Sequence, residues 1–544
     1  MHPHDLPWPD AAPTPALHLC LLQPPGYVHT LGLVDAARYL RWQLRRQGAS
    51  VSLAKNRLRH DAVNLVLGAH LLGRHPTLPP DLLDGHCCLV VNLEQLGPGG
   101  APVAPDYLAL LQRSAVVDYD TGNLAAYARD PADVPVIGFG PASYLVPTDP
   151  LPLGQRPIDL LFFGSLNERR RALLARIEAA GLQVTQFDHP LYAQERDHFI
   201  GQAKAVLNGH FYATSRFEQV RAFHVLSLGT PLLSERGPLT QAAPVFEAAV
   251  DWLPADDLAL TRFLREDFGS PAWCASAQAR LHAFAHDQAA DSALQQAYAG
   301  LLGFAAGYAQ AYARARPAPG PWRPRCINLG SGKDYRPGWL NLDILERTQP
   351  DLVLDLGQPR QWPLQATGPL GATVRLEAGS VDLVYANNVL EHVPDLPALM
   401  GNVLTLLREG GEFHIEVPYE GACTAWQDPT HVRALNEASW RYYTEWFWYL
   451  GWFEHRFETA QFQWLDEQLR PCTRDQAAFM KLTLRKVATT PRERTLARTL
   501  QPDFGGLPQD WPADPTPDTP PQVAPAAGSA TPPPLQAATR PQPA

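Results

Sequence analysis

The sequence has few cysteines, and none of them lies in a pattern typical of a metal site. Seven cysteines occur in 544 residues, and no two of them form a CxxC pair. Tetrahedral zinc sites and disulfide frameworks depend on such spacings or on a secreted context. We therefore interpret the thiols as reduced and mostly buried, and we expect no bound metal. The cysteines are Cys20, Cys87, Cys88, Cys274, Cys326, Cys423 and Cys472.

The sequence also lacks long apolar runs and an excess of basic residues. No uninterrupted apolar stretch reaches the roughly 18 residues of a transmembrane helix, and Met1–Pro15 lacks the basic flank and apolar core of a secretory signal. The 55 Asp and Glu residues outnumber the 45 Lys and Arg, which makes the formal net charge -10. This balance disfavours nucleic acid as a partner. We expect a cytoplasmic protein.

The N-terminal half alternates short apolar runs with longer amphipathic stretches, which indicates an α/β fold with parallel sheets covered by helices. We expect two tandem Rossmann-like units, at residues 16–150 and 151–315. The first unit's expected strands are Leu17–Leu22, Val51–Leu53, Val63–Leu67, Cys87–Asn92, Ala115–Tyr119 and Val134–Phe139, and the second unit's are Ile158–Gly164, Gln183–Phe187 and Ala205–Asn208.

Proline-rich segments mark the remaining boundaries. Leu258–Arg316 is rich in alanine with apolar residues at helical spacing, and four prolines follow in 316–324, which we interpret as a linker. A third α/β alternation follows at 325–490. We expect disorder for residues 1–15 and for the Pro, Ala and Thr tail at 502–544.

A glycine turn follows the first apolar run of this third region. The sequence Cys-Ile-Asn328-Leu329-Gly330-Ser331-Gly332 indicates a short buried strand that ends where glycine lets the backbone approach a ligand closely. The GxxxxGK[ST] pattern of a P-loop is excluded, because Ile327 and Asp334 occupy two of its required positions. The dinucleotide pattern GxGxxG lacks its third glycine, since Tyr335 stands there, and this disfavours NAD.

Two acidic residues end the next two expected strands. Asp343 closes Gly338-Trp-Leu-Asn-Leu-Asp343, where one carboxylate can accept hydrogen bonds from both hydroxyls of a ribose. Asp355 closes Asp351-Leu-Val-Leu-Asp355 and reaches the same edge of the sheet. A fourth strand, beginning at Ser380, continues through Asn387 into a helix that would start near Glu391 and His392.

These motifs resemble the class I S-adenosylmethionine-dependent methyltransferases, in particular a bacterial group with NLGSG, GWLNLD and SVDLVYANNVLEHV. The resemblance covers residues 325 to about 465. It implies that Asn328 to Gly332 contact the methionine part of S-adenosylmethionine, that Asp343 binds its ribose, and that Asp355 lies near its adenine. The wider cofactor set also includes Asn387, Glu391 and His392. The helix between Gly332 and Trp339 is expected to be shorter than in many relatives.

Methyl transfer to a hydroxyl requires a base that removes the proton of the acceptor. The segment Asp428-Pro-Thr-His431 is similar to a recurring motif of this group after the fifth strand. His431 is our candidate base, with Asp428 orienting it or binding a sugar. A structural contact that orders the loop remains the alternative for both. An aromatic-rich segment, Ser439–Phe453, suits either sugar contacts or core packing.

The N-terminal half resembles the GT-B glycosyltransferases in its arrangement and in the segment from Glu218 to Glu235. This resemblance implies that Glu218, with Arg221 one helical turn later, contributes to a nucleotide-sugar site. His224 stands where some of these families carry a second glutamate. The alternative is that Glu218 and Arg221 form an ion pair on a helix of a non-catalytic domain.

We therefore expect a fusion enzyme that O-methylates a saccharide or polysaccharide and has a glycosyltransferase-like N-terminal half, with a small molecule or glycan as acceptor. Two alternatives remain open. The chain is a methyltransferase of a non-sugar metabolite with a non-catalytic binding module, or it is a cofactor-binding scaffold without activity.

Overall fold

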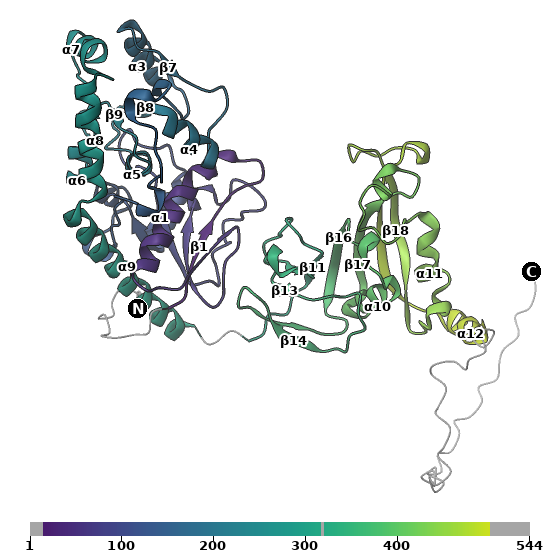
Figure 1. Cartoon of the computed structure of the whole chain (residues 1–544). Coiled ribbons are helices and arrows are strands. Elements are labelled where there is room, and N and C mark those ends of the chain that lie inside the picture. Colours follow the sequence, from purple (N-terminus) through teal and green to yellow (C-terminus); the bar gives the residue numbers. More distant parts are fainter. Residues whose placement is uncertain (1–14, 317–319, 501–544) are drawn as a thin grey trace, which may run out of the picture. The chain divides into compact units, whose positions relative to one another are not determined.

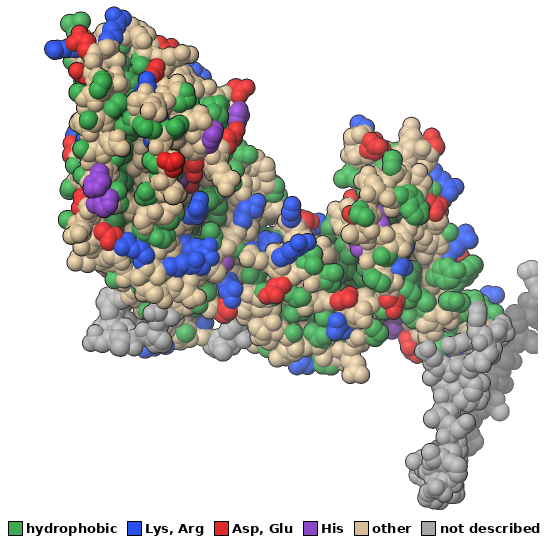
Figure 2. Space-filling model, viewed as in Figure 1, with side chains coloured by type: hydrophobic (Ala, Val, Ile, Leu, Met, Phe, Trp, Pro, Cys, Tyr) green, Lys and Arg blue, Asp and Glu red, His purple; other side chains and the backbone are tan. Residues whose placement is uncertain are grey.

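The computed structural model describes residues 15–316 and 320–500 (Figure 1). The disorder predicted for 1–15 and 502–544 concerns residues outside these ranges, apart from Pro15. No helix in the described ranges is long and apolar enough to cross a membrane. On the face viewed in Figure 2, acidic and basic side chains are intermingled.

The described residues divide into two compact units. Residues 15–440 and 457–487 form the first unit, which contains three large sheets and a two-stranded one, and residues 441–456 and 488–500 form the second.

The first sheet is parallel, and its strand order is β2-β1-β3-β4-β5. Its interior strands are buried along their whole length, as parallel strands between two helical layers must be. The predicted sixth strand at Val134–Phe139 is wrong. Only an isolated bridge from Asp118 to Val136 extends the sheet there, because the segment turns away after one parallel contact. The elements are β1 Leu17–Leu21, α1 Leu33–Arg46, β2 Val51–Lys55, β3 Val63–Leu67, β4 Cys88–Asn92, α2 Pro105–Arg113 and β5 Ala115–Asp118.

The second sheet is also parallel, with the order β10-β9-β8-β6-β7. Asn167 is the N-cap of the helix Glu168–Ala179, since its side chain accepts a hydrogen bond from the backbone of Arg170. The elements are β6 Ile158–Leu161, α3 Glu168–Ala179, β7 Val184–Thr185, α4 Ala193–Gln202, β8 Ala203–Asn208, α5 Gln219–Ser227, β9 Leu232–Ser234, α6 Pro244–Ala249 and β10 Asp251–Trp252.

The alanine-rich segment after the second sheet is helical but interrupted. Pro271 starts a new helix at its first position, where Ser270 supplies the capping hydroxyl for the backbone of Trp273. The elements are α7 Asp257–Arg262, a π turn Phe263–Asp267, α8 Pro271–Ala285 and α9 Gln288–Ala315.

The third sheet has seven strands in the order β13-β12-β11-β16-β17-β19-β18. Five strands are parallel, and β19 runs antiparallel to β17. The α/β fold class expected from the sequence is confirmed. The elements are β11 Cys326–Leu329, β12 Leu340–Asp343, β13 Leu352–Val353, β14 Leu364–Thr367, β15 Thr373–Leu376, β16 Val381–Asn387, α10 Leu396–Leu406, β17 Leu407–Pro418, β18 His455–Leu465 and β19 Phe479–Ala488, with β14 and β15 pairing as a separate hairpin.

Two helix predictions in this region are corrected. The connection from β11 to β12 contains turns and no helix, because Pro337 lacks an amide hydrogen and Gly338 takes a φ of +79°. The helix expected at Glu391 and His392 begins only at Leu396, since Asp395 is its N-cap. Glu391 and His392 instead lie on a short 3-10 turn, Leu390–His392.

The second compact unit contains most of the aromatic-rich segment, including α11 Arg441–Thr444, and the C-terminal helix α12 Pro491–Leu500. Phe447, Phe453 and Ala497 form its buried core. Tyr442, Trp446 and Tyr449 are exposed, and their rings contact one another edge to face. Part of the aromatic content therefore serves core packing, and part lies at the surface.

Candidate functional site

The carboxyl ends of the parallel strands in the third sheet form one edge. Strand β11 lies between β12 and β16. The chain first adds β12 and β13 on one side of β11 and later adds β16 and β17 on its other side. Open parallel sheets bind ligands at such switch points, outside the carboxyl ends of their strands. The predicted cofactor residues follow these strand ends.

Gly332 and Asp343 meet at this edge. The backbone N–H of Gly332 donates to Oδ2 of Asp343 at 2.7 Å, and the N–H of Leu345 donates to Oδ1 at 2.8 Å. Both Gly330 and Gly332 have positive φ, +62° and +46°. A Cβ at Gly330 would lie 2.4 Å from Cγ2 of Val389, so the turn requires glycine for its conformation and for its close packing.

The other residues of the glycine turn support it from inside. The Asn328 amide donates to Oδ1 of Asn341 at 3.0 Å and to the backbone oxygen of Asp334 at 2.5 Å. The Asn328 amide nitrogen is therefore engaged in ordering the loop. Leu329 is buried in the core, and the buried Oγ of Ser331 has no hydrogen-bond partner among the described residues.

Asp355 and Asn387 reach the same edge from either side of these strands. Asp355 follows β13, and its Oδ1 accepts from the N–H of Gly357 at 2.7 Å. Asn387 ends β16 with an exposed side chain. In the described residues neither side chain hydrogen-bonds to Asp343, so their predicted cofactor roles depend on the shared edge alone.

Glu391 is a buried acid without a compensating contact. Its side chain is 2% exposed, and neither carboxylate oxygen has a hydrogen-bond partner among the described residues. Burial raises the pKa of this carboxyl to about 7, against a smaller opposing effect of its own backbone and of His431. Perturbed acids of this kind are frequent at functional sites.

His431 comes from the loop after β17 and faces Glu391. Its Nε2 lies 4.0 Å from Oε1 of Glu391, and Nδ1 lies 2.9 Å from the backbone oxygen of Ala425. Its ring is edge to face with that of His392, with centroids 4.7 Å apart. A bridge between Tyr419 and Leu435 closes the loop.

Asp428 does not orient His431 directly. Its Oδ1 accepts from the hydroxyl of Thr430 at 2.6 Å and from the Thr430 N–H at 2.8 Å. The hydroxyl oxygen of Thr430 lies 3.0 Å from Nδ1 of His392. Within the described residues, Asp428 thus acts on His392 through Thr430.

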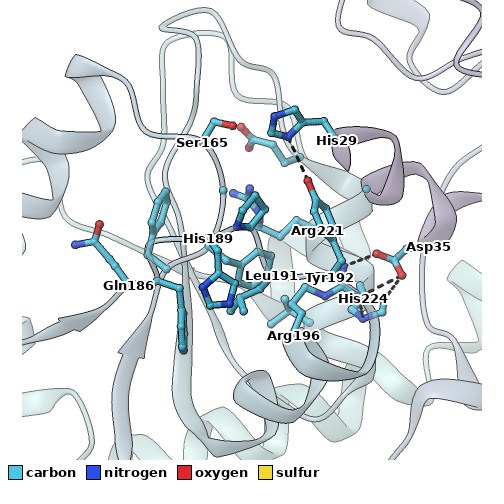
Figure 3. A pocket seen from close by; sticks show the side chains of 18 of the residues that line it. His29, Asp35, Ser165, Gln186, His189, Leu191, Tyr192, Arg196, Arg221 and His224 are labelled. Carbon is cyan, nitrogen blue, oxygen red and sulfur yellow. Dashed lines mark hydrogen bonds and ion pairs between the residues drawn. The ribbon is translucent and has the colours of Figure 1, made fainter. Parts of the chain in front are cut away.

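The predicted donor-site residues line a pocket of about 520 Å³ in the N-terminal half. Figure 3 shows its side chains, which include Arg221 and His224 from α5 and Asp35 from α1. Glu218 precedes α5 as its N-cap residue, but its carboxylate makes no capping hydrogen bond. Its Oε2 is held by Asn208 and His210, and its Oε1 has no hydrogen-bond partner among the described residues.

Glu218 and Arg221 are joined through Asn208, which ends β8. The Asn208 amide donates to Oε2 of Glu218 at 3.0 Å, and Arg221 donates to Oδ1 of Asn208 at 2.9 Å. No direct ion pair between Glu218 and Arg221 occurs in the described part of the chain. Burial would raise the pKa of Glu218, but His210, at 2.7 Å, together with Arg221 and Asn208 lowers it to about 2.

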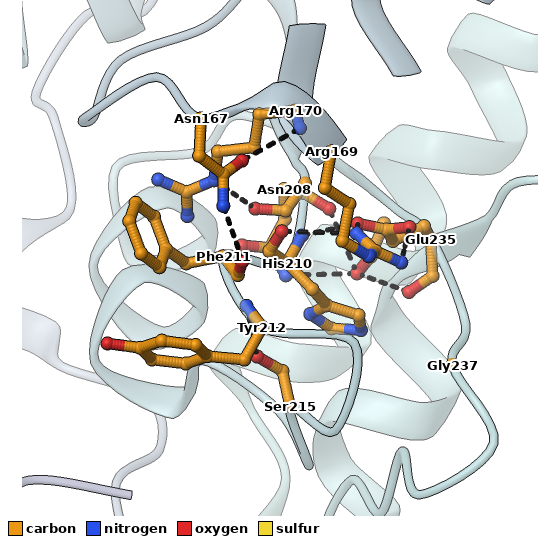
Figure 4. Close-up of polar contacts among 12 residues, drawn as sticks. Asn167, Arg169, Arg170, Asn208, His210, Phe211, Tyr212, Ser215, Glu235 and Gly237 are labelled. Carbon is orange, nitrogen blue, oxygen red and sulfur yellow. Dashed lines mark hydrogen bonds and ion pairs between the residues drawn. The ribbon is translucent and has the colours of Figure 1, made fainter. Parts of the chain in front are cut away.

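A second polar network supports the loop that follows β8 (Figure 4). Glu235, just after β9, accepts from the guanidinium of Arg169 and from the backbone N–H of His210. Arg170 donates to the backbone oxygen of Gly209 at 2.9 Å. The ends of β8 and β9 are thereby tied to α3, which holds His210 beside Glu218.

Sequence reasoning missed Asp35 and Arg196. Arg196 on α4 donates to both carboxylate oxygens of Asp35, at 2.5 and 3.2 Å, and also contacts Asp197. His224 joins this cluster, with Nε2 2.7 Å from Oδ1 of Asp197. The available signal was an acid between Val34 and Ala36, on the apolar face of a helix.

Comparisons with known proteins agree with this architecture. Residues 307–467 match a family model described as a methyltransferase domain. A comparison with curated proteins found no match.

Several solved structures match parts of this chain. A crystal structure of TarM is 8% identical, with 45% of this chain and 55% of that chain covered and a TM-score of 0.32. AviGT4, a glycosyltransferase of avilamycin A biosynthesis, is 15% identical, with coverages of 53% and 98% and a TM-score of 0.33. A methyltransferase from Mesorhizobium loti is 18% identical, with coverages of 32% and 94% and a TM-score of 0.20. This chain thus spans about half of TarM.

The chain contains a C-terminal methyltransferase domain of the kind that typically uses S-adenosylmethionine. Its N-terminal part contains two parallel five-stranded sheets in tandem, as the sequence predicted.

Proposed function

We propose that the third α/β region, residues 325–490, binds S-adenosylmethionine and methylates a hydroxyl of a saccharide. The contact between Gly332 and Asp343 carries this proposal, because it joins the tips of β11 and β12 at the switch point of the sheet. When bound, S-adenosylmethionine supplies an electrophilic methyl group. The residues of the chain then need to bind it, hold an acceptor in line and accept a proton.

The residues at this edge fit the cofactor. Each oxygen of the Asp343 carboxylate accepts one backbone N–H and keeps a further lone pair, so both can also accept from ribose hydroxyls. Gly330 lacks the Cβ that would collide with Val389 and presents bare backbone. Asn328, Leu329, Ser331, Asp355, Asn387, Glu391 and His392 complete the proposed cofactor surroundings.

His431 is the proposed base for the acceptor hydroxyl. Because Nδ1 faces the backbone oxygen of Ala425, it carries the hydrogen, and Nε2 keeps the lone pair that can accept a proton. Asp428 contributes by ordering the loop through Thr430. A hydroxyl acceptor is favoured over an already nucleophilic amine because only the hydroxyl needs this base.

The proposed role of the N-terminal half is transfer of a sugar from a nucleotide donor. The Oε1 of Glu218 would accept from the nucleotide ribose, and the half-buried guanidinium of Arg221 would compensate the negative charge of the nucleotide. The pocket of about 520 Å³ has the volume of a typical small-molecule site.

One observation favours the second candidate, a binding module without glycosyl transfer. His224 stands where some related families have a glutamate, and its Nε2 already contacts Asp197. In that case methylation of a non-sugar metabolite is the reaction of the chain as a whole.

Calorimetry on the full chain tests the cofactor proposal. We expect S-adenosylmethionine and S-adenosylhomocysteine to bind with a Kd near 1 µM, or about -8 kcal/mol. Absence of binding by both would overturn the proposal.

Binding assays with UDP-, GDP- and dTDP-sugars test the N-terminal half. Glycosyl transfer is supported if the chain binds and turns over a nucleotide sugar and if Glu218→Ala weakens that binding. Binding without turnover on a broad acceptor panel supports the binding module, and no binding of any nucleotide sugar excludes glycosyl transfer. Transfer of labelled methyl groups to saccharides or to non-sugar hydroxyls identifies the acceptor class.

A further inference from the structure

Three potential ligand side chains converge beside the methyltransferase edge from two separate loops. Glu391 and His392 lie on the turn after β16, and His431 lies in the loop after β17. One ligand atom from each residue lies within 4.8 Å of the other two. The N–H of Val432 donates to the backbone oxygen of Glu391 at 2.9 Å, which holds the two loops together.

Glu391 is the unusual member of this cluster. Its carboxylate is almost completely removed from solvent, yet neither oxygen has a hydrogen-bond partner in the described residues. An isolated buried carboxylate costs several kcal/mol unless it is neutralised, paired or bound to a cation. The two neighbouring groups are imidazoles, of which the Nε2 of His431 is 4.0 Å away.

The two imidazoles are oriented as metal ligands usually are. Nδ1 of His431 faces the oxygen of Ala425, and Nδ1 of His392 faces the Thr430 hydroxyl, which itself donates to Asp428. Ligating histidines commonly donate their second ring N–H to a carbonyl or a carboxylate-linked group, which selects the tautomer and directs the other nitrogen at the ion. Neither Nε2 has a hydrogen-bond partner in the described residues, so each keeps a lone pair for a cation.

The distances fit a cation after small movements. Two ligands about 2.1 Å from one ion lie about 3.0 to 3.4 Å apart in octahedral or tetrahedral geometry. The observed separations of 4.0 Å and at most 4.8 Å need to shorten by roughly 0.6 to 1.8 Å, within reach of side-chain rotations.

We propose that Glu391, His392 and His431 form a binding site for a first-row divalent transition-metal ion. Two imidazoles and one carboxylate suit Zn²⁺, Co²⁺ or Fe²⁺, whereas Mg²⁺ and Ca²⁺ prefer oxygen ligands alone. Three protein ligands leave further coordination positions open, as in catalytic metal sites. The cysteine spacing predicted no bound metal, because that pattern detects only sites built from thiolate ligands.

The ion has a role in the proposed methyl transfer, and this part rests on that proposed function. Val389, two residues before Glu391, packs on Gly330 of the proposed cofactor turn. An acceptor hydroxyl bound at an open position would lose its proton to solvent and become a metal-bound alkoxide. Its oxygen then forms the bond to the methyl carbon, while the carbon–sulfur bond breaks and its electron pair stays on sulfur. With the metal bound, His431 would serve as a ligand and the proton would pass to water, whereas in the metal-free chain His431 keeps its proposed role as the base.

The metal site is tested first without any cofactor or acceptor. The untagged full chain, freed of metal by chelation, is titrated with Zn²⁺ by calorimetry and with Co²⁺ by visible absorption. We expect one equivalent to bind, and we expect Glu391→Gln and His431→Ala each to weaken it by at least about 100-fold. Thr430→Val removes the partner of His392 and should weaken binding about 10- to 100-fold.

His414→Ala is the matched control, because this histidine pairs with Glu412 on β17, outside the cluster. Circular dichroism of each variant verifies folding. Equal affinity and stoichiometry in wild type, Glu391→Gln and His431→Ala would overturn the metal site, as would binding of Mg²⁺ in preference to Co²⁺ and Zn²⁺.

Methyl transfer with and without chelator tests the catalytic role separately. Activity that disappears on chelation and returns with Zn²⁺ or Co²⁺ supports it. Full activity in chelator, or in Glu391→Gln, overturns the catalytic role. Metal binding in a chain that methylates nothing would contradict the proposed function and leave the site itself established.

Discussion

The carboxylate of Asp343 accepts a hydrogen bond from the backbone of Gly332 at 2.7 Å, and thereby joins the tips of two parallel strands. The same carboxylate accepts from Leu345 through its other oxygen. Both oxygens are thus oriented before any ligand arrives, which reduces the entropy lost when a ribose binds.

Replacement of Asp343 tests this arrangement. We expect Asp343→Ala to weaken binding of S-adenosylhomocysteine by roughly 1 to 3 kcal/mol, since ribose hydroxyls and two N–H groups lose their acceptor. Calorimetry measures the loss. Asp382→Ala, at the surface pair with Arg325, is the control and should bind normally. An unchanged affinity in Asp343→Ala would exclude the carboxylate from the cofactor site.

A methyl group at Gly330 should disturb the cofactor turn. In Gly330→Ala the new Cβ meets Val389 at 2.4 Å at a φ of +62°, so we expect weaker cofactor binding and a lower Tm. Gly379→Ala is the matched control, with a φ of +68° and no atom within 4 Å of the added Cβ. It reports the cost of the backbone conformation alone.

The collision itself is tested by a second substitution. Val389→Ala in the Gly330→Ala background removes the atom that the Cβ meets and should restore part of the binding. If Gly330→Ala and Gly379→Ala lower the Tm equally and both bind cofactor normally, close packing at Gly330 has no role.

The buried carboxyl of Glu391 should make stability depend on pH in the metal-free protein. Its folded pKa of about 7 lies above the ordinary value of 4.5, so the folded state loses stability as pH rises from about 4.5 through 7. The penalty is full above pH 7 and amounts to roughly 1 to 3 kcal/mol. His431, Asp428 and His392 are the ionisable groups around it.

Glu391→Gln removes this penalty. In the presence of chelator, we expect its Tm relative to wild type to rise by several degrees between pH 5 and pH 8. Exposed Glu458→Gln should show no such change. A Tm difference that does not change with pH would mean that burial does not raise the pKa of Glu391 in the folded protein.

His210 should keep the proposed donor site active at acid pH. The pKa of Glu218 is about 2 despite burial, largely because of His210, so wild-type Glu218 stays charged throughout pH 5 to 8. In His210→Phe burial dominates and the pKa rises. We expect nucleotide-sugar affinity to fall by about 10-fold at pH 5, with little loss at pH 8.

Exposed His198→Phe provides the comparison for this experiment. Affinity that is lost equally at both pH values would instead indicate that His210 supports the loop and has no electrostatic effect on Glu218.

The ion pair between Asp35 and Arg196 should contribute strongly to stability. The side chains of Arg196 and Asp35 are 7% and 9% exposed, respectively. Asp35→Ala leaves the buried guanidinium without its main partner and should lower the free energy of unfolding by about 3 to 5 kcal/mol. Arg46, on the same helix α1 as Asp35, forms an exposed pair with Asp291. Asp291→Ala breaks this pair and should lower the free energy of unfolding by about 1 kcal/mol or less. Thermal unfolding compares the two variants, and similar Tm values would contradict the contrast.

Local patterns determined the strands and the glycine turn. Short apolar runs such as Val63–Leu67 are buried strands, because strands of a parallel sheet are covered on both faces and are therefore apolar at every position. Gly332 and Asp343 were predicted from their places at strand ends, since parallel strands carry their carboxyl ends to one edge. The segment Val134–Phe139 failed because one parallel contact does not make a strand.

The long-range contacts followed from the tertiary structure alone. His431 reaches Glu391 from another loop, and Arg196 reaches Asp35 across 161 positions of sequence. Neither pair has a local pattern, because each depends on where distant loops and helices are placed. Short-range periodicity, by itself, determined the α/β layers and the ends of the strands. Which charges are buried, and which of them lack partners, was decided only when those layers packed.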